Sequence, residues 1–183
     1  FLEGTVGEAS IDKREDGLYV SFDVAEGDQY SIGKITATGD LVGKSAEYTL
    51  EDIKSEPGDT FSATQVRNDI FTITDKFSDE GYAYANVVPN TSINKKEKTV
   101  DLDFASTKGN IVKINKISVS GNEKTYDNVI RRTLKIEEQQ LYSGTKIKRS
   151  QTLLQRLGYF DEVSITNQPT GDPSVVDLDV HVK

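Results

Sequence analysis

The chain has 183 residues, 35% of them hydrophobic and 28% charged, which is the composition of a globular protein without one large core. Its formal net charge of −8 argues against nucleic acid as the main ligand, because such binding relies on clustered Lys and Arg. The absence of cysteine excludes disulfides and thiol chemistry, and no apolar run approaches the roughly 20 residues of a membrane-spanning helix.

The first segment contains two stretches of alternating side chains around a turn signal at Asp16-Gly17. Leu18, Val20 and Phe22 recur at every second position, which is the period of a strand with one apolar face. No amphipathic helix pattern accompanies them. Residues 1–26 are therefore predicted to form a hairpin with uncovered apolar side chains, and such an isolated hairpin is marginal in water.

Residues 27–107 have the pattern of five elements in the order β-α-α-β-β. Ser62, with Gln65 three positions later, has the form of a capping box that begins a helix, and Gly81 ends that helix. The turn signal Pro57-Gly58-Asp59 separates it from a shorter helix. Strands are expected at about 30–37, 84–93 and 99–106, and helices at about 46–55 and between Ser62 and Gly81.

Residues 108–183 repeat this order with different residues. Thr125 is expected to cap the first helix, whereas Ser143 begins the second and Gly158 closes it. Strands are expected at about 111–119, 161–167 and 175–182. The last of them alternates apolar with polar side chains, so one face of the sheet should be buried and the other exposed to water.

An internal repeat relates the two segments. Gly109 follows Gly27, and Gly121 follows Gly39, by the same 82 positions (109 − 27 and 121 − 39). Within the second helix the offset falls from 81 (147 − 66) to 77 (158 − 81), which predicts about one extra helical turn in the first unit. The sequence thus predicts an α+β fold of tandem β-α-α-β-β units. Each unit is a three-stranded mixed sheet covered on one face by two helices, and the C-terminal hairpin of a truncated unit precedes them.

Pro89 identifies an edge strand in the first unit. Proline has no N–H to donate, so its strand is expected outside, in the spatial order one, three, two. An edge strand can accept a guest strand by β-augmentation. The lysines within 95–98 are charges that protect such an edge, so the second unit should offer the better site, and proline at Ser164 or Thr166 should weaken binding without unfolding. The predicted peptide-binding residues are Val163, Ser164, Ile165, Thr166, Val87 and Val88.

Several motifs resemble one family, the polypeptide-transport-associated (POTRA) domains. They include the glycine after each first strand, the connection Pro57-Gly58-Asp59-Thr60-Phe61-Ser62 and, most specifically, Leu153-Leu154-Gln155-Arg156-Leu157-Gly158-Tyr159-Phe160. The second unit departs from the pattern where Glu138-Gln139-Gln140 replaces Pro-Gly-Asp. The whole chain resembles the last two periplasmic domains of the BamA outer-membrane protein assembly family.

The resemblance implies a scaffold, not an enzyme, in the periplasmic portion of a Gram-negative outer-membrane protein. It would receive unfolded outer-membrane proteins, dock accessory lipoproteins and precede a C-terminal membrane barrel. Tyr82, Tyr159 and Phe160 are candidate partner or hinge contacts. The connection at residues 105–109 is short, so hinge motion between the units should be limited.

Two alternatives remain open at this point. The chain could be the periplasmic substrate-recognition part of a two-partner secretion transporter, or a small β-α-α-β-β hydrolase. For the hydrolase, the sequence offers no identifiable nucleophile beside a base. His181, on the polar face with Asp177 and Asp179, is interpreted as solvated, as is the basic pair Arg131-Arg132. No catalytic residue, metal site or cofactor is predicted.

Overall fold

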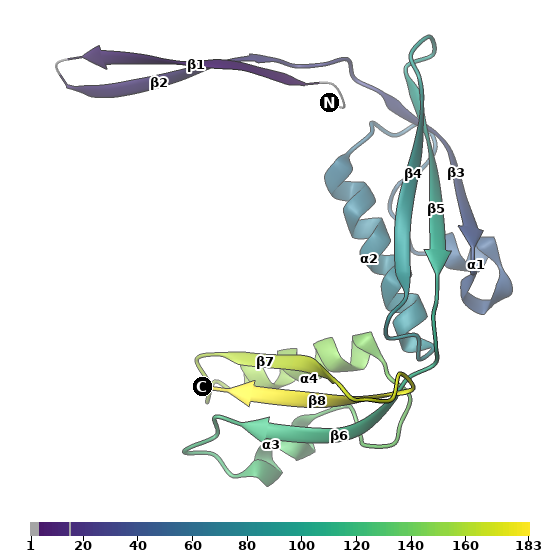
Figure 1. Cartoon of the computed structure of the whole chain (residues 1–183), viewed down its shortest axis with the longest axis vertical. Helices are drawn as coiled ribbons and strands as arrows, with labels where there is room; N and C mark the ends of the chain where they lie inside the picture. Colours follow the sequence, from purple (N-terminus) through teal and green to yellow (C-terminus); the bar gives the residue numbers. More distant parts are fainter. Residues whose placement is uncertain (1–3, 15) are drawn as a thin grey trace.

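Three β-sheets follow one another along the chain in a computed structural model that describes residues 4–14 and 16–183 (Figure 1). A two-stranded hairpin comes first, and two three-stranded sheets with helices follow, which we call the first and second units. The hairpin consists of β1 (Thr5–Arg14) and β2 (Gly17–Ala25). The first unit contains β3 (Ser31–Gly39), η1 (Val42–Lys44), α1 (Ala46–Leu50), α2 (Ala63–Asp79), β4 (Asn86–Asn94) and β5 (Thr99–Thr107). The second contains β6 (Lys113–Ser120), α3 (Asp127–Thr133), α4 (Gly144–Arg156), β7 (Val163–Pro169) and β8 (Val175–Val182).

Both units have the same sheet topology, which confirms the predicted fold class and strand order. The strand orders are β3-β5-β4 and β6-β8-β7. The central strand pairs in parallel with the first strand and antiparallel with the second. The proline-bearing strand β4 is therefore at an edge, as Pro89 indicated, and β7 occupies the same place in the second unit.

Each unit buries its own core between one sheet face and its helices. In the first unit Val100, Leu102 and Phe104 of β5 are buried against residues such as Ile73 and Phe77 of α2. In the second, the alternating valines and leucine of β8 pack with Ile130 of α3 and Leu154 of α4, among others. No described helix is both long and apolar enough to cross a membrane.

The second helices differ in length as the repeat predicts. α2 has 17 residues and α4 has 13, so the four extra residues lie within the helix and not in a loop. Ser62 and Ser143 are both N-caps, and their hydroxyls accept hydrogen bonds from the N–H groups of Gln65 and Lys146. The capping box of Ser62 is half formed, because the Gln65 side chain instead donates to Asp69.

Two expectations about the first helices are wrong. α1 ends at Leu50 and not near residue 55, because the N–H groups of Lys54 and Ser55 turn to the buried carboxylate of Asp69 instead of continuing the helix. Thr125 is not the N-cap of α3. Tyr126 holds that position without a side-chain hydrogen bond.

The turns between the helices are equivalent despite their different residues. Gly58, with φ of 97°, donates its N–H to the carbonyl of Ile32 at 2.7 Å. Gln139, with φ of 68°, donates to Ile114 at 2.6 Å in the same way. The second unit therefore forms the turn of Pro57-Gly58-Asp59 with a residue that rarely adopts positive φ. At Glu138-Gln139-Gln140 the second unit therefore differs from the motif in its residues but not in the geometry of the turn.

The hairpin β1–β2 lacks the cover that the other sheets have. Leu18, Val20 and Phe22 are 69%, 54% and 57% exposed, as expected for a hairpin without its helices. Figure 1 shows it extending away from the first unit.

Candidate peptide-binding edges and the junction between units

The hydrogen bonding at the end of β7 determines which backbone groups face outward. Glu162 and Lys183 exchange both of their backbone hydrogen bonds, at 3.3 and 3.0 Å. In an antiparallel pair, hydrogen-bonded pairs alternate with non-bonded pairs. Ser164 and Thr166, an even number of residues from Glu162, therefore point their N–H and C=O groups at β8. The odd-numbered residues from Val163 to Pro169 point theirs away from the sheet.

This alternation divides the residues predicted to bind a peptide. Val163 and Ile165 present their backbone to a guest strand, whereas Ser164 and Thr166 do not. Proline at Ser164 or Thr166 would remove a hydrogen bond within the sheet, so the expectation that these positions tolerate it is wrong. The positions whose N–H faces outward are Val163, Ile165 and Asn167.

The outer edge of β7 is open over a short window. Gln151 of α4 donates to the carbonyl of Val163 at 2.8 Å, and Pro169 supplies no donor at the far end. Among the described residues, no hydrogen bond reaches the outward backbone groups of Ile165 or Asn167. A guest strand would find two residues with both groups available.

The edge of β4 is interrupted in its middle. Pro89 pairs with Phe104 and has no N–H, so it belongs to the non-bonded set, together with Val87 and Thr91. Val87 therefore faces outward at the backbone while its side chain is buried, and Val88 points its backbone groups at β5. The edge of β4 thus loses a donor at its centre, whereas β7 loses one at its end.

The opposite edge of each sheet is occupied over part of its length. In the second unit Glu138 accepts from the N–H of Ile117 at 2.9 Å, and Arg131 donates to its carbonyl at 2.9 Å. The turn before α4 satisfies both backbone groups of Ile114, and the equivalent turn satisfies those of Ile32 in the first unit. Among the described residues, no turn occupies the edges of β4 and β7 in this way.

The three aromatic candidates have different environments. Tyr82 packs against the first core, edge-on to Phe77 with ring centroids 6.4 Å apart, and the ammonium of Lys108 lies 5.2 Å from its ring. It thus lies beside the connection between the units. Phe160 packs against the second core, and Tyr159 beside it is 68% exposed.

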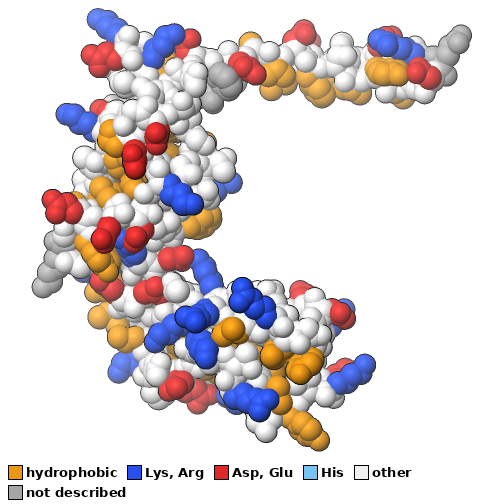
Figure 2. Space-filling model, turned by 180° about the vertical axis from the view of Figure 1, so that it is seen from behind, with side chains coloured by type: hydrophobic (Ala, Val, Ile, Leu, Met, Phe, Trp, Pro, Cys, Tyr) orange, Lys and Arg blue, Asp and Glu red, His pale blue; other side chains and the backbone are white. Residues whose placement is uncertain are grey.

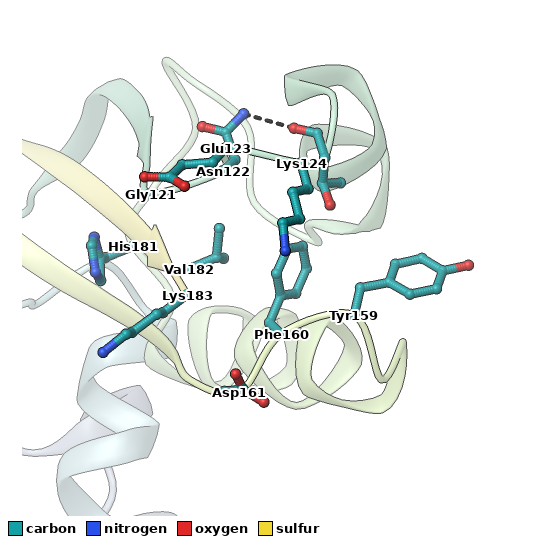
Figure 3. A pocket seen from close by; sticks show the side chains of 11 residues that line it. Gly121, Asn122, Glu123, Lys124, Tyr159, Phe160, Asp161, His181, Val182 and Lys183 are labelled. Atoms are coloured by element: carbon teal, nitrogen blue, oxygen red, sulfur yellow. Dashed lines mark hydrogen bonds between the residues drawn. The ribbon is translucent and has the colours of Figure 1, made fainter.

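A cavity of about 570 Å³ lies at the end of the second unit, between the loop after β6 and the loop after α4. Figure 3 shows Phe160 and Lys124 pointing into it, while Tyr159 points away. On the nearby sheet, Ser120 Oγ lies 3.0 Å from Nδ1 of His181 and 3.3 Å from the carboxylate oxygens of Asp179. A catalytic triad places histidine between the other two groups, so this surface chain of hydrogen bonds does not activate the serine.

A polar junction joins the two units, and no sequence pattern predicted it. Asp79, at the last position of α2, accepts from the Ser143 hydroxyl at 2.7 Å and from the Thr145 N–H at 3.1 Å, so it extends the cap of α4. Lys148 forms an ion pair with Asp75 at 2.7 Å. Nothing in the local pattern of either helix distinguishes these side chains from ordinary solvated ones.

Backbone and apolar contacts complete the junction. The N–H of Val112 donates to the carbonyl of Gly81 at 2.8 Å. Ala83 of the first unit packs against the core of the second, and Gly81 lies against Ile111 and Leu141. These contacts connect the units more extensively than the short segment 105–109 does alone.

Comparison with known proteins places the fold in a family. A model of the POTRA family, described as the surface antigen variable number repeat, matches residues 30–109 and 112–183, and the chain belongs to that family. The outer membrane protein assembly factor BamA of Nitratidesulfovibrio vulgaris is 33% identical over 187 residues, covering 100% of this chain and 24% of that protein. BamA of Neisseria meningitidis serogroup B is 31% identical, covering 88% of this chain and 20% of that protein.

Solved structures agree on the fold. Domains POTRA3-5 of Haemophilus influenzae BamA match with a TM-score of 0.84 at 21% identity, over 100% of this chain and 73% of that one. BamA of Haemophilus ducreyi lacking POTRA domains 1-3 matches with a TM-score of 0.67 at 21% identity, over 85% of this chain and 29% of that one. The chain spans about a quarter of the curated relatives' length. It is a periplasmic portion of an outer-membrane protein.

Proposed function

We propose that the chain is a non-enzymatic scaffold in an outer-membrane β-barrel assembly machine. It receives unfolded outer-membrane proteins as strands added to a sheet edge, and it docks accessory lipoproteins beside a C-terminal membrane barrel. Support comes from the relatives, which are named outer membrane protein assembly factors. The proposed boundaries are residues 1–26 for the truncated unit and 27–107 and 108–183 for the complete ones.

The observation that best supports strand addition is the difference in hydrogen bonding between the two edges of each sheet. Neighbouring turns and the side chains of Glu138 and Arg131 occupy part of the β3 and β6 edges, and no turn of the described residues occupies those of β4 and β7. Backbone hydrogen bonds make few demands on the guest's side chains, which suits clients of many sequences. The β7 window at Ile165 and Asn167 is uninterrupted, so it is the preferred site.

Asn167 provides the sharpest test of this site. Its side chain is exposed, so Asn167→Pro removes the outward N–H with little effect on the core. Asn167→Ala is the matched control, because it removes the amide bonded to Tyr142 and keeps the N–H. We expect the proline variant alone to weaken binding of a labelled β-strand peptide from an outer-membrane barrel, by about 2- to 10-fold for one lost hydrogen bond of 0.5–1.5 kcal/mol. Fluorescence anisotropy measures this.

A second comparison separates binding from folding. Thr166→Pro removes a hydrogen bond to β8, so it should lower the melting temperature of the second unit, whereas Asn167→Pro should not. Equal peptide binding by Asn167→Pro and the parent chain would exclude β7 as the site. Equal loss in the Asn167→Ala variant would attribute the effect to the side chain.

Accessory docking is assigned to the end of the second unit. Tyr159 is 68% exposed beside a cavity that the half-buried Phe160 lines, and exposed tyrosine next to a concave surface is typical of protein interfaces. Tyr159→Ala should therefore reduce capture of accessory subunits while leaving the fold intact, because little of this side chain is buried. Copurification from a strain carrying the full-length protein tests it.

A further inference from the structure

The two complete units share a fold and differ in charge. Residues 108–183 contain 12 Lys and Arg against 9 Asp and Glu, a net charge of +3 (12 − 9), whereas residues 27–107 contain 8 against 14, a net charge of −6 (8 − 14). Half of these basic residues, six of 12, lie on the helices α3 and α4, which carry only one of the nine acidic residues. α4 has four basic residues and no acidic one, whereas its counterpart α2 has two basic and three acidic ones.

The basic side chains gather on the outer side of the helical layer. The inward positions of α4 are Ile147, Ser150 and Leu154, so Arg149 and Arg156 project from the opposite side. Lys135 lies beside the middle of α4, because its N–H donates to Ser150 Oγ at 2.8 Å. Figure 2 shows blue side chains clustered over the second unit on this side. We call this surface the basic face; it consists of Arg132, Lys135, Lys146, Arg149 and Arg156.

These five side chains are exposed and have no ion pair within the described part of the chain. Their neighbours are paired: Arg131 with Asp127, and Lys148 with Asp75. The fold does not require all of these charges, because Gln65 and Asn68 of α2 stand at the positions of Lys146 and Arg149 (146 − 65 and 149 − 68 are both 81). From the sequence, Arg132 was interpreted as ordinary solvated surface. Because four other unpaired cations share its side of the helical layer, we interpret it instead as part of a binding surface.

We propose that the basic face binds an anionic phospholipid surface and orients the chain on the membrane. Of the five residues of the basic face, Lys146 alone lines one of the main cavities of the described residues, so the face suits an extended surface better than a small ligand. The chain belongs to an outer-membrane protein, which keeps a lipid surface nearby. The anionic membrane repels residues 1–107, which are acidic. The second unit therefore contacts the membrane, and the first unit is held away from it.

Vesicle binding by the whole chain tests this proposal independently of strand addition. The probes are neutral phosphatidylcholine vesicles and vesicles with about one part phosphatidylglycerol to three parts phosphatidylcholine. We expect sedimentation with the anionic vesicles alone, at about 0.05 M salt and not at about 0.5 M. The variant Lys135→Gln/Arg149→Gln/Arg156→Gln should bind roughly 10- to 100-fold more weakly. Lys34→Gln/Lys54→Gln/Arg67→Gln, with the same charge change on the first unit, should bind like the parent.

A pair of fluorescent reporters measures the orientation. The chain has no tryptophan, and Thr152, on α4 between Arg149 and Arg156 of the basic face, corresponds to Phe71 on α2 (152 − 71 = 81). Thr152→Trp should shift to shorter wavelength on anionic vesicles and Phe71→Trp should not. This readout keeps the proposal testable if the triple variant unfolds.

Three results would overturn the proposal. The first is failure of the parent chain to bind anionic vesicles at low salt. The second is an equal loss of binding in the two triple variants, which would indicate a general charge effect. The third is capture by immobilised poly-glutamate without binding to vesicles, which would identify an acidic protein segment as the partner of the basic face.

Discussion

The hairpins β1–β2 and β4–β5 have the same alternating apolar pattern and opposite environments. Leu18, Val20 and Phe22 of β2 are 69%, 54% and 57% exposed, whereas Val100, Leu102 and Phe104 at the equivalent positions of β5 are 0%, 1% and 0% exposed. The pattern is sufficient to specify a strand in both places. Burial depends on the helices that a complete unit adds, so the comparison separates what the strands contribute from what their cover contributes.

The largest expected effect comes from truncating equivalent phenylalanines. Phe104→Ala should destabilise the first unit by about 3–5 kcal/mol, because it leaves a cavity in a filled core. Phe22→Ala should change stability by less than about 0.5 kcal/mol, because the side chain is already in water. Urea denaturation followed by circular dichroism measures both. Similar losses in the two variants would mean that the hairpin face is covered in solution.

The junction between the units ranks next. Asp79→Ala removes the acceptor for Ser143 and for the Thr145 N–H, and loss of such a cap costs about 1–2 kcal/mol. Asp75→Ala is the control, because its ion pair with Lys148 is partly exposed to water and should contribute at most about 1 kcal/mol. Distances between spin labels on the two units should broaden more in the Asp79 variant. Equal broadening of these distances in the two variants would mean that the apolar contacts of Gly81 maintain the angle between the units.

The turns between the helices allow the two complete units to be compared directly. Gln139→Gly should stabilise the second unit by about 1 kcal/mol, because a residue with a Cβ has φ of 68° there. The reciprocal change Gly58→Ala should destabilise the first unit by a similar amount, since φ is 97°. Thermal denaturation checks both signs. A destabilised Gln139→Gly variant would show that the side chain's bond to the Asn115 carbonyl outweighs the strain.

The smallest effect concerns the polar face of the first sheet. Burial tends to raise the pKa of Asp103, but hydrogen bonds from Thr38, Thr36 and Asn90 outweigh it and lower the pKa below its ordinary value. The stabilisation is therefore present at neutral pH and is lost as pH falls through the lowered pKa. Thr36→Val/Thr38→Val should move the pKa of Asp103 upward in an NMR titration. An unchanged pKa would assign the shift to Asn90.

The periodicity of the side chains was enough to predict the order of the elements and the edge strands. Ser62 and Ser143 cap helices because each is followed by an amphipathic stripe, and Pro89 lies at an edge because it cannot donate. Boundaries that depend on a distant partner were missed. The early end of α1 depends on Asp69, which lies 15 positions from Lys54 and joins it only after α2 has packed.

The sequence by itself thus determined the repeat, the β-α-α-β-β order and the candidate edges, because these follow from local periodicity and from single residues such as proline. The tertiary structure decided which backbone groups of β7 face outward, since that depends on the pairing of Glu162 with Lys183. It also decided that Asp79 caps a helix of the next unit. Such facts depend on residues far apart in the chain, and only the folded backbone brings them within hydrogen-bonding distance.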